Sequence, residues 1–585
     1  MPSQSKETSL NLQPNAYRSR SGSGRVVPLP VLIVSALAMI LGIVLLVVGA
    51  FKVGVTWDER IHAVMLEEFF SSGWYASPDW LVNGNPDAFL GKWPYYVYAP
   101  VAALAGHIFA FASGSEQWGG FSDSASAYAA RHLAASFLAL LGILASGLIV
   151  RVVTRSWRWA ILGMGLLSSV PMWIGHGMFN GKDLPVATGY TIATLGLVVM
   201  LTRSYTESWR TRVLAIGCTA LGLVLAVGTR PASGLPVALT AFGMLALFAV
   251  IGLRSKRGPR LLSSPGRRSL DVVLGLGLGY LVLAMLYPKG FINPFTLAKE
   301  SLLISGRFPV NDRVLTNGTW LSQPPPWFYL PEWFGFQLPL LTLIGCLGFL
   351  IYWIWNVIRV VVSRLSRSSR ELLLVTPVVA QLLLLPLLAV AVHSTMYNAV
   401  RQFLFVVPAA TILAVLGTRQ IFQVLSRGET PYRIARPILW VLVTIGIALP
   451  VADSVRLFPY TYTYFNELSA VQGINGRWAT DYWRASSQEL TSRIPALGAV
   501  TCRLPIDGKP ISDCTLEAPY VPFLNLRGTD ALPGALAQGE FWFARENNGD
   551  VSTPPGCDLH DSLTRQLRGE EVIIAQVFRC GPAAL

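Results

Sequence analysis

The chain has 585 residues, of which 52% are hydrophobic and only 13% are charged, and its mean hydropathy is +0.49. Soluble domains carry about 25% charged residues, so this composition excludes a water-soluble globular protein. The 46 Lys and Arg residues outnumber the 32 Asp and Glu residues, which leaves a net charge of +14. Because most of the surplus lies in short loops between apolar runs, it indicates membrane topology and not nucleic-acid binding.

The chain begins with a polar, basic segment over residues 1–27, which predicts a disordered cytoplasmic tail. The apolar run over 28–51 is too long for a signal-peptide core, so it predicts a retained first span. Ten further runs, each about 17–25 residues long, are predicted to span the membrane. They cover residues 126–150, 159–178, 184–202, 212–229, 235–253, 270–287, 337–362, 372–392, 403–418 and 437–452.

Basic residues cluster in five short connectors between these runs, and the positive-inside rule places the five connectors in the cytoplasm. The segment 96–113 is also apolar enough to span, but a full crossing there would invert every later loop and break the rule. We therefore expect this segment to be re-entrant or interfacial. The prediction is a polytopic α-helical membrane protein with about eleven full spans and one ambiguous segment, its N-terminus inside and its C-terminus outside.

Three long segments are predicted to lie on the outer side. Residues 54–95 are rich in Trp and Tyr, which suits helices in the lipid headgroup layer. Residues 288–335 are rich in Pro and aromatic residues. Residues 453–585 turn polar and contain short β-like runs such as 571–578. They predict a small extracytoplasmic α+β domain that follows a transmembrane domain over 28–452.

Four of the six cysteines, Cys502, Cys514, Cys557 and Cys580, lie in this terminal domain. An even number of cysteines in an outward-facing domain indicates disulfides formed in an oxidising compartment. Sequence alone permits three pairings, and we favour the two local ones, Cys502–Cys514 and Cys557–Cys580. Four free thiols are the alternative.

Two adjacent carboxylates, Asp58 and Glu59, stand directly after the first predicted span. Carboxylates at a membrane surface are costly to desolvate unless they are paired or used. A helical turn here would also place His62 on the same face as Asp58. The functional interpretation is a general base that accepts a proton from an attacking hydroxyl. The structural alternative is a solvated helix start, because acids suit the first turn.

A second polar group lies in the outward connector that contains Asn180, Lys182 and Asp183. Asp183 stands at the mouth of the next span, and Pro185 follows in its first turn, where a missing N–H costs little. An acid in this position would assist Asp58, bind a sugar hydroxyl or ligate a cation. The alternative is an ion pair with its neighbour Lys182.

Basic residues are few on the predicted outer side, where five lie at membrane boundaries. They are Lys92, Arg131, Lys182, Arg230 and Arg401. Each by itself is more typical of a snorkelling anchor. As a set that opposes two acids, they indicate binding of a lipid phosphate. The sequence contains no phosphate-binding P-loop, no Gly-x-Ser-x-Gly elbow and no His-Glu-x-x-His zinc helix.

At these residues the chain resembles the GT-C membrane glycosyltransferases. It is most similar to the phospholipid-carrier-dependent branch, which includes protein O-mannosyltransferases and the lipid A aminoarabinose transferase. The similarity runs from about residue 50 to 490 and is carried by short motifs in a shared order. They are Asp58-Glu59, Gly91-Lys92-Trp93-Pro94-Tyr95-Tyr96, Ala130-Arg131-His132-Leu133, Phe179-Asn180-Gly181-Lys182-Asp183-Leu184-Pro185, Pro326-Trp327-Phe328-Tyr329, Asn398-Ala399-Val400-Arg401, and the signature of residues 459–468 followed by Asp481-Tyr482-Trp483. Trp93 stands where the family's second motif has its first Pro.

The resemblance implies an inverting transfer of a sugar from a polyprenyl-phosphate carrier to a hydroxyl on the outer face of the cell membrane. Asp58 would be the general base, Glu59 would support it or orient the acceptor, and Asp183 would complete the acidic centre. Lys92 would hold the donor phosphate, as its counterpart does in the family. Arg131, Lys182 and Arg401 would assist it.

Four further residues are expected to bind substrate: His62, Asn180, Trp327 and Tyr329. The aromatic residues among them belong to the 288–335 loop, which would fold over the donor. We expect no metal or other cofactor, because the site has only two obvious acids. The acceptor would be a glycan, a lipid or a protein. Two alternatives are a lipid-linked sugar flippase or exporter and a non-catalytic envelope scaffold.

Overall fold

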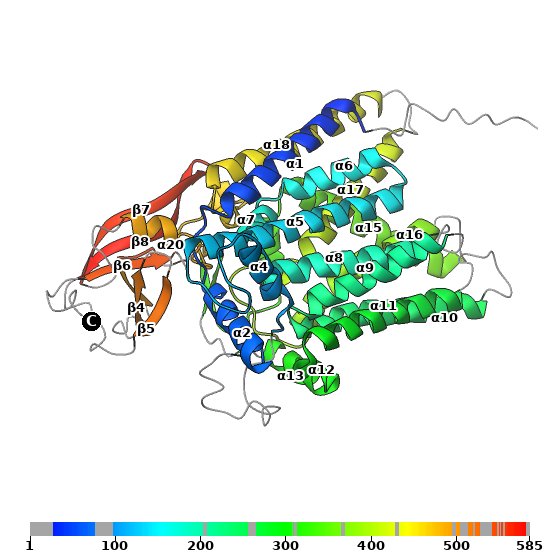
Figure 1. Cartoon of the computed structure of the whole chain (residues 1–585). Coiled ribbons are helices and arrows are strands. Elements are labelled where there is room, and N and C mark those ends of the chain that lie inside the picture. The colour runs from blue at the N-terminus through cyan, green and yellow to red at the C-terminus, as the bar shows by residue number, and fades with distance from the viewer. Residues whose placement is uncertain are drawn as a thin grey trace, which may run out of the picture.

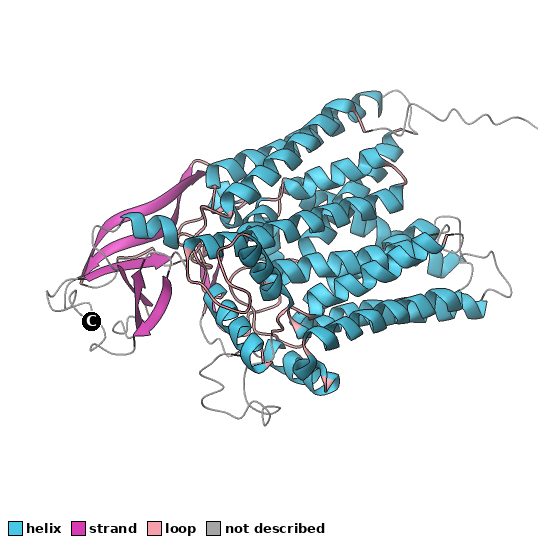
Figure 2. Ribbon diagram, in the orientation of Figure 1, coloured by secondary structure: helices cyan, strands magenta, loops and turns pink. Residues whose placement is uncertain are grey.

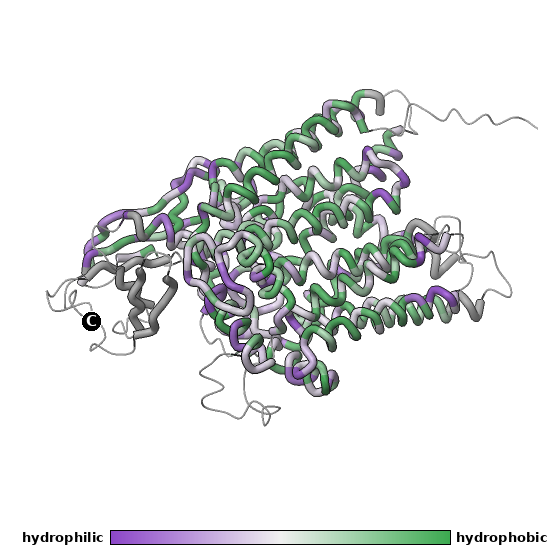
Figure 3. The backbone as a smooth tube through the Cα atoms, in the orientation of Figure 1, coloured by the Kyte–Doolittle hydropathy of each residue, from purple (hydrophilic) through white to green (hydrophobic). Residues whose placement is uncertain are grey.

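The computed structural model describes residues 27–76, 98–202, 208–254, 265–306, 308, 313–363, 369–426, 432–493, 499–503, 513–518, 521–526, 541–546, 549, 551–553 and 556–580. Within these residues, long helices run side by side in a bundle, and a β-sheet lies at one end of it (Figures 1 and 2). The helices are hydrophobic along most of their length, and polar residues gather at their ends and in the connecting loops (Figure 3). This distribution is the one expected for a protein that spans a membrane.

Ten helices among the described residues are long and apolar enough to cross a membrane, so the chain is a multi-pass membrane protein. They match ten of the eleven predicted spans. They are α1 (Leu29–Gly49), α5 (Ala125–Thr154), α8 (Asp183–Met200), α9 (Trp209–Val227), α10 (Gly234–Arg254), α11 (Pro265–Leu286), α15 (Leu340–Ser363), α16 (Ser369–Ala391), α17 (Val406–Leu425) and α18 (Tyr432–Leu457).

One prediction is wrong: the segment 159–178 was expected to be a single helix, but two helices occupy it. Helix α6 (Trp157–Ser168) ends before Val170, which is extended, and α7 (Pro171–Phe179) begins at Pro171. A proline lacks the N–H that would continue a helix and disfavours helical geometry in the residue before it. Both helices pack against α1 and α5. The chain therefore follows the bundle through this region as a broken helix.

The ambiguous segment 96–113 contains a single short helix, α4 (Val101–Ala112). Its 12 residues span roughly 18 Å, whereas the hydrocarbon core is about 30 Å thick. Helix α4 is therefore too short to cross by itself, in keeping with the predicted incomplete crossing. It packs against α5 and against α2 (Glu59–Ser72). Both α2 and α4 lie near the end of the bundle that carries the β-sheet (Figure 1).

Shorter elements fill the connectors and the segment that follows the last span. They are η3 (Pro231–Ser233), α12 (Pro288–Phe291), α13 (Pro294–Gly306), the antiparallel pair β1 (Val314–Thr316) and β2 (Thr319–Leu321), α14 (Tyr329–Gln337), η4 (Arg401–Phe403), η5 (Thr461–Thr463), α19 (Ser469–Gln472) and α20 (Ser487–Arg493). The last span, α18, continues to Leu457, five residues beyond the predicted boundary at 452.

The terminal domain is built around a six-stranded sheet with the order β5-β4-β3-β6-β8-β7. Its neighbouring strands are antiparallel except for β3 and β6, which are parallel. The strands are β3 (Ala499–Arg503), β4 (Asp513–Ala518), β5 (Val521–Leu526), β6 (Phe541–Glu546), β7 (Cys557–Leu567) and β8 (Glu570–Cys580). With α20 before the sheet, this is the predicted α+β domain, and the β-like run over 571–578 lies inside β8.

The register of the sheet bears on the predicted disulfides. Cys502 lies opposite Cys514 across β3 and β4, and Cys557 lies opposite Cys580 across β7 and β8. Cys557 is disulfide-bonded. Both favoured pairings thus join residues that face one another on adjacent strands, although the pairings themselves stay predictions.

The β7–β8 hairpin is held against the end of α18 and the chain that follows it. Arg568, at the tip of the hairpin, lies 2.6 Å from a carboxylate oxygen of Asp453, which is only 1% exposed. The Glu570 carboxylate accepts hydrogen bonds from the backbone N–H groups of Ile474 and Asn475 at 2.9 and 3.0 Å. These contacts fix the sheet to the same segment that, further along, forms one wall of the pocket described next.

Candidate active site

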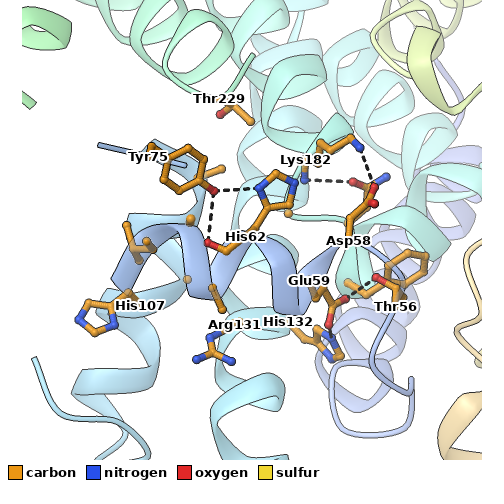
Figure 4. A pocket seen from close by; sticks show the side chains of 18 of the residues that line it. Thr56, Asp58, Glu59, His62, Tyr75, His107, Arg131, His132, Lys182 and Thr229 are labelled. Carbon is orange, nitrogen blue, oxygen red and sulfur yellow. Dashed lines mark hydrogen bonds and ion pairs between the residues drawn. The ribbon is translucent and has the colours of Figure 1, made fainter. Parts of the chain in front are cut away.

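A pocket lies at the end of the bundle where α2, α4 and the start of α5 meet the connector between α7 and α8 (Figure 4). Counting its open mouth, the pocket has about 780 Å³ of empty space. Polar side chains line both of its ends, and small apolar residues such as Ala102, Ala103 and Gly106 lie between them.

Asp58 is the residue that precedes α2, and it reaches two buried cations. One of its carboxylate oxygens lies 2.6 Å from Lys182 Nζ and 3.5 Å from an Arg401 guanidinium nitrogen. The side chains of Lys182 and Arg401 are each only 6% exposed, whereas that of Asp58 is 28% exposed. Lys182 comes from the connector before α8 and Arg401 from the start of η4. The structure thus brings together three residues predicted to share a site.

The charges at this point stabilise one another. Burial by itself would raise the pKa of Asp58, but Lys182, and then Arg401 and His62, lower it, and the pKa lies well below its usual value. Burial would lower the pKa of Lys182, but Asp58 outweighs this effect and raises it. Asp58 and Lys182 therefore form an ion pair in which both members stay charged.

Asp183 begins α8 within a second, linked set of contacts. Its carboxylate accepts hydrogen bonds from the Asn180 amide and from Arg230, both at 3.3 Å. The Asn180 side-chain oxygen accepts hydrogen bonds from the backbone N–H groups of Lys182 and Asp183, at 3.0 and 2.8 Å, where the connector enters α8. The Asn180 amide also donates to His176 Nδ1 at 3.0 Å. The connector is therefore rigidly held around Asp183.

In the combined cluster, positive charges outnumber negative charges, and two N–H donors have no acceptor among the described residues. Lys182, Arg230 and Arg401 supply three positive charges against the two carboxylates of Asp58 and Asp183, so the excess is one. The Nε atoms of Arg230 and Arg401 are buried and have no hydrogen-bond partner within the described part of the chain. Buried donors are normally satisfied. The cluster is therefore suited to bind an anion with several oxygen atoms.

Glu59 points to a different set of partners from Asp58. Its carboxylate accepts a hydrogen bond from the Thr56 hydroxyl at 2.9 Å and from His132 Nε2 at 3.0 Å. The other ring nitrogen of His132 donates to the Ala50 carbonyl at 2.9 Å. Glu59 lines the pocket next to Asp58, and Figure 4 marks its contacts with Thr56 and His132.

His62 lies one helical turn after Asp58 and also lines the pocket, as the sequence predicted. Its Nδ1 atom is 2.8 Å from the Tyr75 hydroxyl, and its ring meets Tyr98 edge-on at 4.7 Å between centroids. Burial and then the nearby Lys182 charge lower the pKa of His62 to about 4. The imidazole is therefore neutral near pH 7 and available as a hydrogen-bonding group.

Arg131 lies at the other end of the pocket from Lys182. It hydrogen-bonds to Glu116, whose second carboxylate oxygen is 2.8 Å from His107 Nδ1. In the view of Figure 4, Arg131 and His107 lie across helix α2 from Lys182 and Asp58. The structure thus separates Arg131 from the other predicted phosphate ligands and pairs it with an acid that the sequence patterns did not single out.

Two of the predicted substrate-binding residues, Trp327 and Tyr329, do not line the pocket. Trp327 is 70% exposed, and Tyr329 is fully buried with its hydroxyl donating to the Ala399 carbonyl at 3.0 Å. Lys92 lies outside the described residues. Within the described residues, no group of three or more His, Cys, Asp or Glu side chains is placed to hold a metal ion.

One residue of the site, Trp483, was not assigned a role from the sequence. It lines the pocket from the segment after the last span, and its ring lies under the Arg401 guanidinium. The available signal was the Asp481-Tyr482-Trp483 motif, which the sequence places outside every span and far from Asp58.

Comparisons with known proteins gave structural likenesses only. No protein-family model matches the chain, and no curated protein matches it in sequence. The chain is similar to the crystal structure of ArnT from Cupriavidus metallidurans bound to undecaprenyl phosphate, with a TM-score of 0.46, 14% identity, and coverage of 94% of this chain and 97% of that one. The apo form of the same ArnT gives a TM-score of 0.44, 14% identity, and coverage of 94% and 98%.

The chain is also similar to the Archaeoglobus fulgidus oligosaccharyltransferase tethered to an acceptor peptide, with a TM-score of 0.41 and 14% identity. That likeness covers 72% of this chain and 55% of the other. ArnT and the oligosaccharyltransferase are both GT-C superfamily members, the group that the sequence motifs resemble. Because the TM-scores lie below 0.5, the functional proposal rests on the residues of the site and not on these likenesses.

Proposed function

We propose that this protein is a membrane glycosyltransferase that moves a sugar from a polyprenyl-phosphate carrier to a hydroxyl acceptor on the outer face of the membrane. The observation that carries the proposal is the cluster of Lys182, Arg230 and Arg401 around Asp58 and Asp183, with one excess positive charge. A lipid phosphate would supply the missing negative charge, and its oxygens would satisfy the unpaired Nε atoms of both arginines.

The second part of the proposal is the chemical step. The acceptor hydroxyl oxygen attacks the anomeric carbon of the sugar, and the bond from that carbon to the phosphate oxygen breaks. The carrier phosphate leaves with the bonding electrons, and the three cations stabilise the charge that builds up on it. Asp58 takes the hydroxyl proton as general base. Attack from the side opposite the leaving phosphate inverts the configuration at the anomeric carbon.

Donor binding would also prepare Asp58 for this role. Without donor, Asp58 is held by Lys182 at 2.6 Å and Arg401 at 3.5 Å, and its low pKa makes it a weak base. A phosphate that shares these two cations weakens their hold on the carboxylate, and the basicity of Asp58 rises. Glu59, which Thr56 and His132 hold in place, would orient the acceptor.

The finer assignments belong to the same proposal. The acceptor is a hydroxyl of a glycan, lipid or protein, the protein lies in the cell membrane, and the N-terminus faces the cytoplasm. The charge asymmetry of the loops supports this orientation. Transfer without a metal or other cofactor stays a prediction, and activity after treatment with EDTA tests it.

The proposal is tested by the affinity of the purified protein for undecaprenyl phosphate in lipid nanodiscs. Lys182→Met removes one charge-assisted contact, which is worth about 1.5–3 kcal/mol, so the affinity should fall roughly 10- to 150-fold. Lys52→Met is the matched control, because Lys52 is exposed on the same side of the bundle shortly before Asp58. Equal affinity of wild type and both variants would refute a phosphate site at Lys182.

A further inference from the structure

Trp483 lies close to two of the cations in this cluster. The Arg401 guanidinium carbon is 4.2 Å from the centroid of the indole ring, and Lys182 Nζ is 5.9 Å from it. Trp483 is 2% exposed and lines the pocket. Cations within about 6 Å of an aromatic face are attracted by its quadrupole, and tryptophan gives the strongest effect. The ring therefore helps to fix both side chains.

The position of Trp483 follows from how the segment after the last span folds back on the start of the chain. The backbone N–H of Trp57 donates to the Trp483 carbonyl at 3.4 Å, and that of Gly54 donates to the Ala485 carbonyl at 2.9 Å. Asp481, fully buried, accepts hydrogen bonds that include one from the Ala485 N–H at 2.9 Å. Trp483 is thus held beside the residues that lead into Asp58.

The indole N–H of Trp483 has no acceptor among the described residues. Phe179 and His176 meet the ring at an angle, with centroids 5.8 and 6.4 Å away. A buried N–H without a partner is costly. The Nε atom of Arg401, whose guanidinium lies over the ring, is also buried and unpaired. Two donors without acceptors thus occur in two side chains that are in contact, and one of them, Trp483, lines the pocket.

We propose that Trp483 is a donor-phosphate ligand. Its indole N–H donates to an oxygen of the polyprenyl phosphate, and its ring holds Arg401 and Lys182 in position for the remaining oxygens. This inference rests on the proposed function, because it assigns a further contact in the same phosphate site. It also gives the segment after the last span, and the terminal domain fixed to that segment, a place in substrate binding.

The test is a series of substitutions that separate the N–H from the ring. Trp483→Phe keeps an aromatic face and loses the donor, so the affinity for undecaprenyl phosphate should fall roughly tenfold or more. Trp483→His keeps a ring N–H in a smaller side chain and should bind more tightly than the Phe variant. A role in packing alone gives the reverse order, because Phe fills the space of the indole better than His.

Trp478→Phe is the matched control. Trp478 is also fully buried, and its Nε1 atom is also unpaired, but it packs among Trp333, Phe336 and Phe465 and does not line the pocket. Its substitution should change the affinity less than twofold. Undecaprenol, which lacks the phosphate, should show no difference among wild type and variants.

The outcomes separate the two proposals. If wild type binds undecaprenyl phosphate and Trp483→Phe binds it equally well, the role of Trp483 is wrong and the proposed function stands. If wild type and all variants bind undecaprenyl phosphate no better than undecaprenol, both proposals fail. Should the Phe variant not fold, Trp483→Met, which also lacks the N–H, takes its place. An affinity of the Met variant for undecaprenyl phosphate equal to that of wild type overturns the inference.

Discussion

Replacing Asp58 by Asn should tighten the binding of undecaprenyl phosphate while it abolishes sugar transfer. In the structure, Asp58 forms ion pairs with Lys182 at 2.6 Å and with Arg401 at 3.5 Å. These are two of the cations that would bind the phosphate. An incoming phosphate has to share them with a carboxylate of its own sign. Asparagine keeps the size of the side chain and removes that negative charge, so the excess positive charge of the cluster rises from one to two.

The magnitude follows from the geometry. A phosphate oxygen at hydrogen-bond distance from Lys182, on the other side from Asp58, would lie about 5 Å from the carboxylate. Two charges at about 5 Å repel by about 3 kcal/mol at an effective dielectric constant of about 20. Asp58 is 28% exposed, so solvent screening reduces this to about 1–2 kcal/mol. The affinity should therefore increase roughly 5- to 30-fold.

Isothermal titration of the protein in nanodiscs with undecaprenyl phosphate measures this change. Glu59→Gln is the control, because Glu59 is bound by Thr56 and His132 and not by the cations. Its substitution should leave the affinity within about twofold, since it lies outside the shared contacts. An unchanged or lower affinity in Asp58→Asn, with the protein folded, would show that Asp58 does not compete with the phosphate.

Two further predictions concern stability, and a third concerns disulfide pairing. The pKa of His62 is lowered from 6.5 to about 4, so as the pH falls the unfolded chain is protonated first. Above pH 6.5, the difference in melting temperature between wild type and His62→Gln should be constant. Between pH 6.5 and 4, the melting temperature of wild type should fall relative to that of the variant. A difference that stays constant over this range would contradict the prediction. Arg568→Ala removes the 2.6 Å partner of the buried Asp453 carboxylate and leaves Arg456 at 3.3 Å. It should destabilise the protein by about 1.5–3 kcal/mol, seen as a lower melting temperature than that of Arg579→Ala. Non-reducing peptide mapping should recover Cys557 linked to Cys580, and recovery of either cysteine as a free thiol would refute the pairing.

Most of the fold could be predicted from the sequence because membrane spans and loop charges are local signals. Ten of the spans were located correctly. The segment that contains the short α4 was not counted as a span, because a crossing there would have placed the later basic loops on the outer side. The break between α6 and α7 was missed. Pro171 lies inside a continuously apolar run, and hydropathy alone does not record the helix break that a proline causes.

The acidic centre could also be predicted, because Asp58, Lys182 and Asp183 lie in short motifs at the mouths of spans. Contacts between residues that are far apart in the sequence could not be predicted. Arg131 follows the same local pattern as Arg401, and only the packing of α4 against α5 pairs it with Glu116. Trp483 is near Asp58 only because the chain returns after its last span and pairs with the segment before α2.

The central claim is tested most directly by sugar transfer with the purified, lipid-reconstituted protein. Radiolabelled polyprenyl-phosphate sugars are offered as a panel together with envelope extract as acceptor, and wild type is compared with Asp58→Asn. We expect labelled product from one donor with wild type and none with the variant, although the variant still binds undecaprenyl phosphate. Consumption of no donor by wild type, together with transport of labelled lipid across the bilayer, would contradict the transferase and favour a flippase.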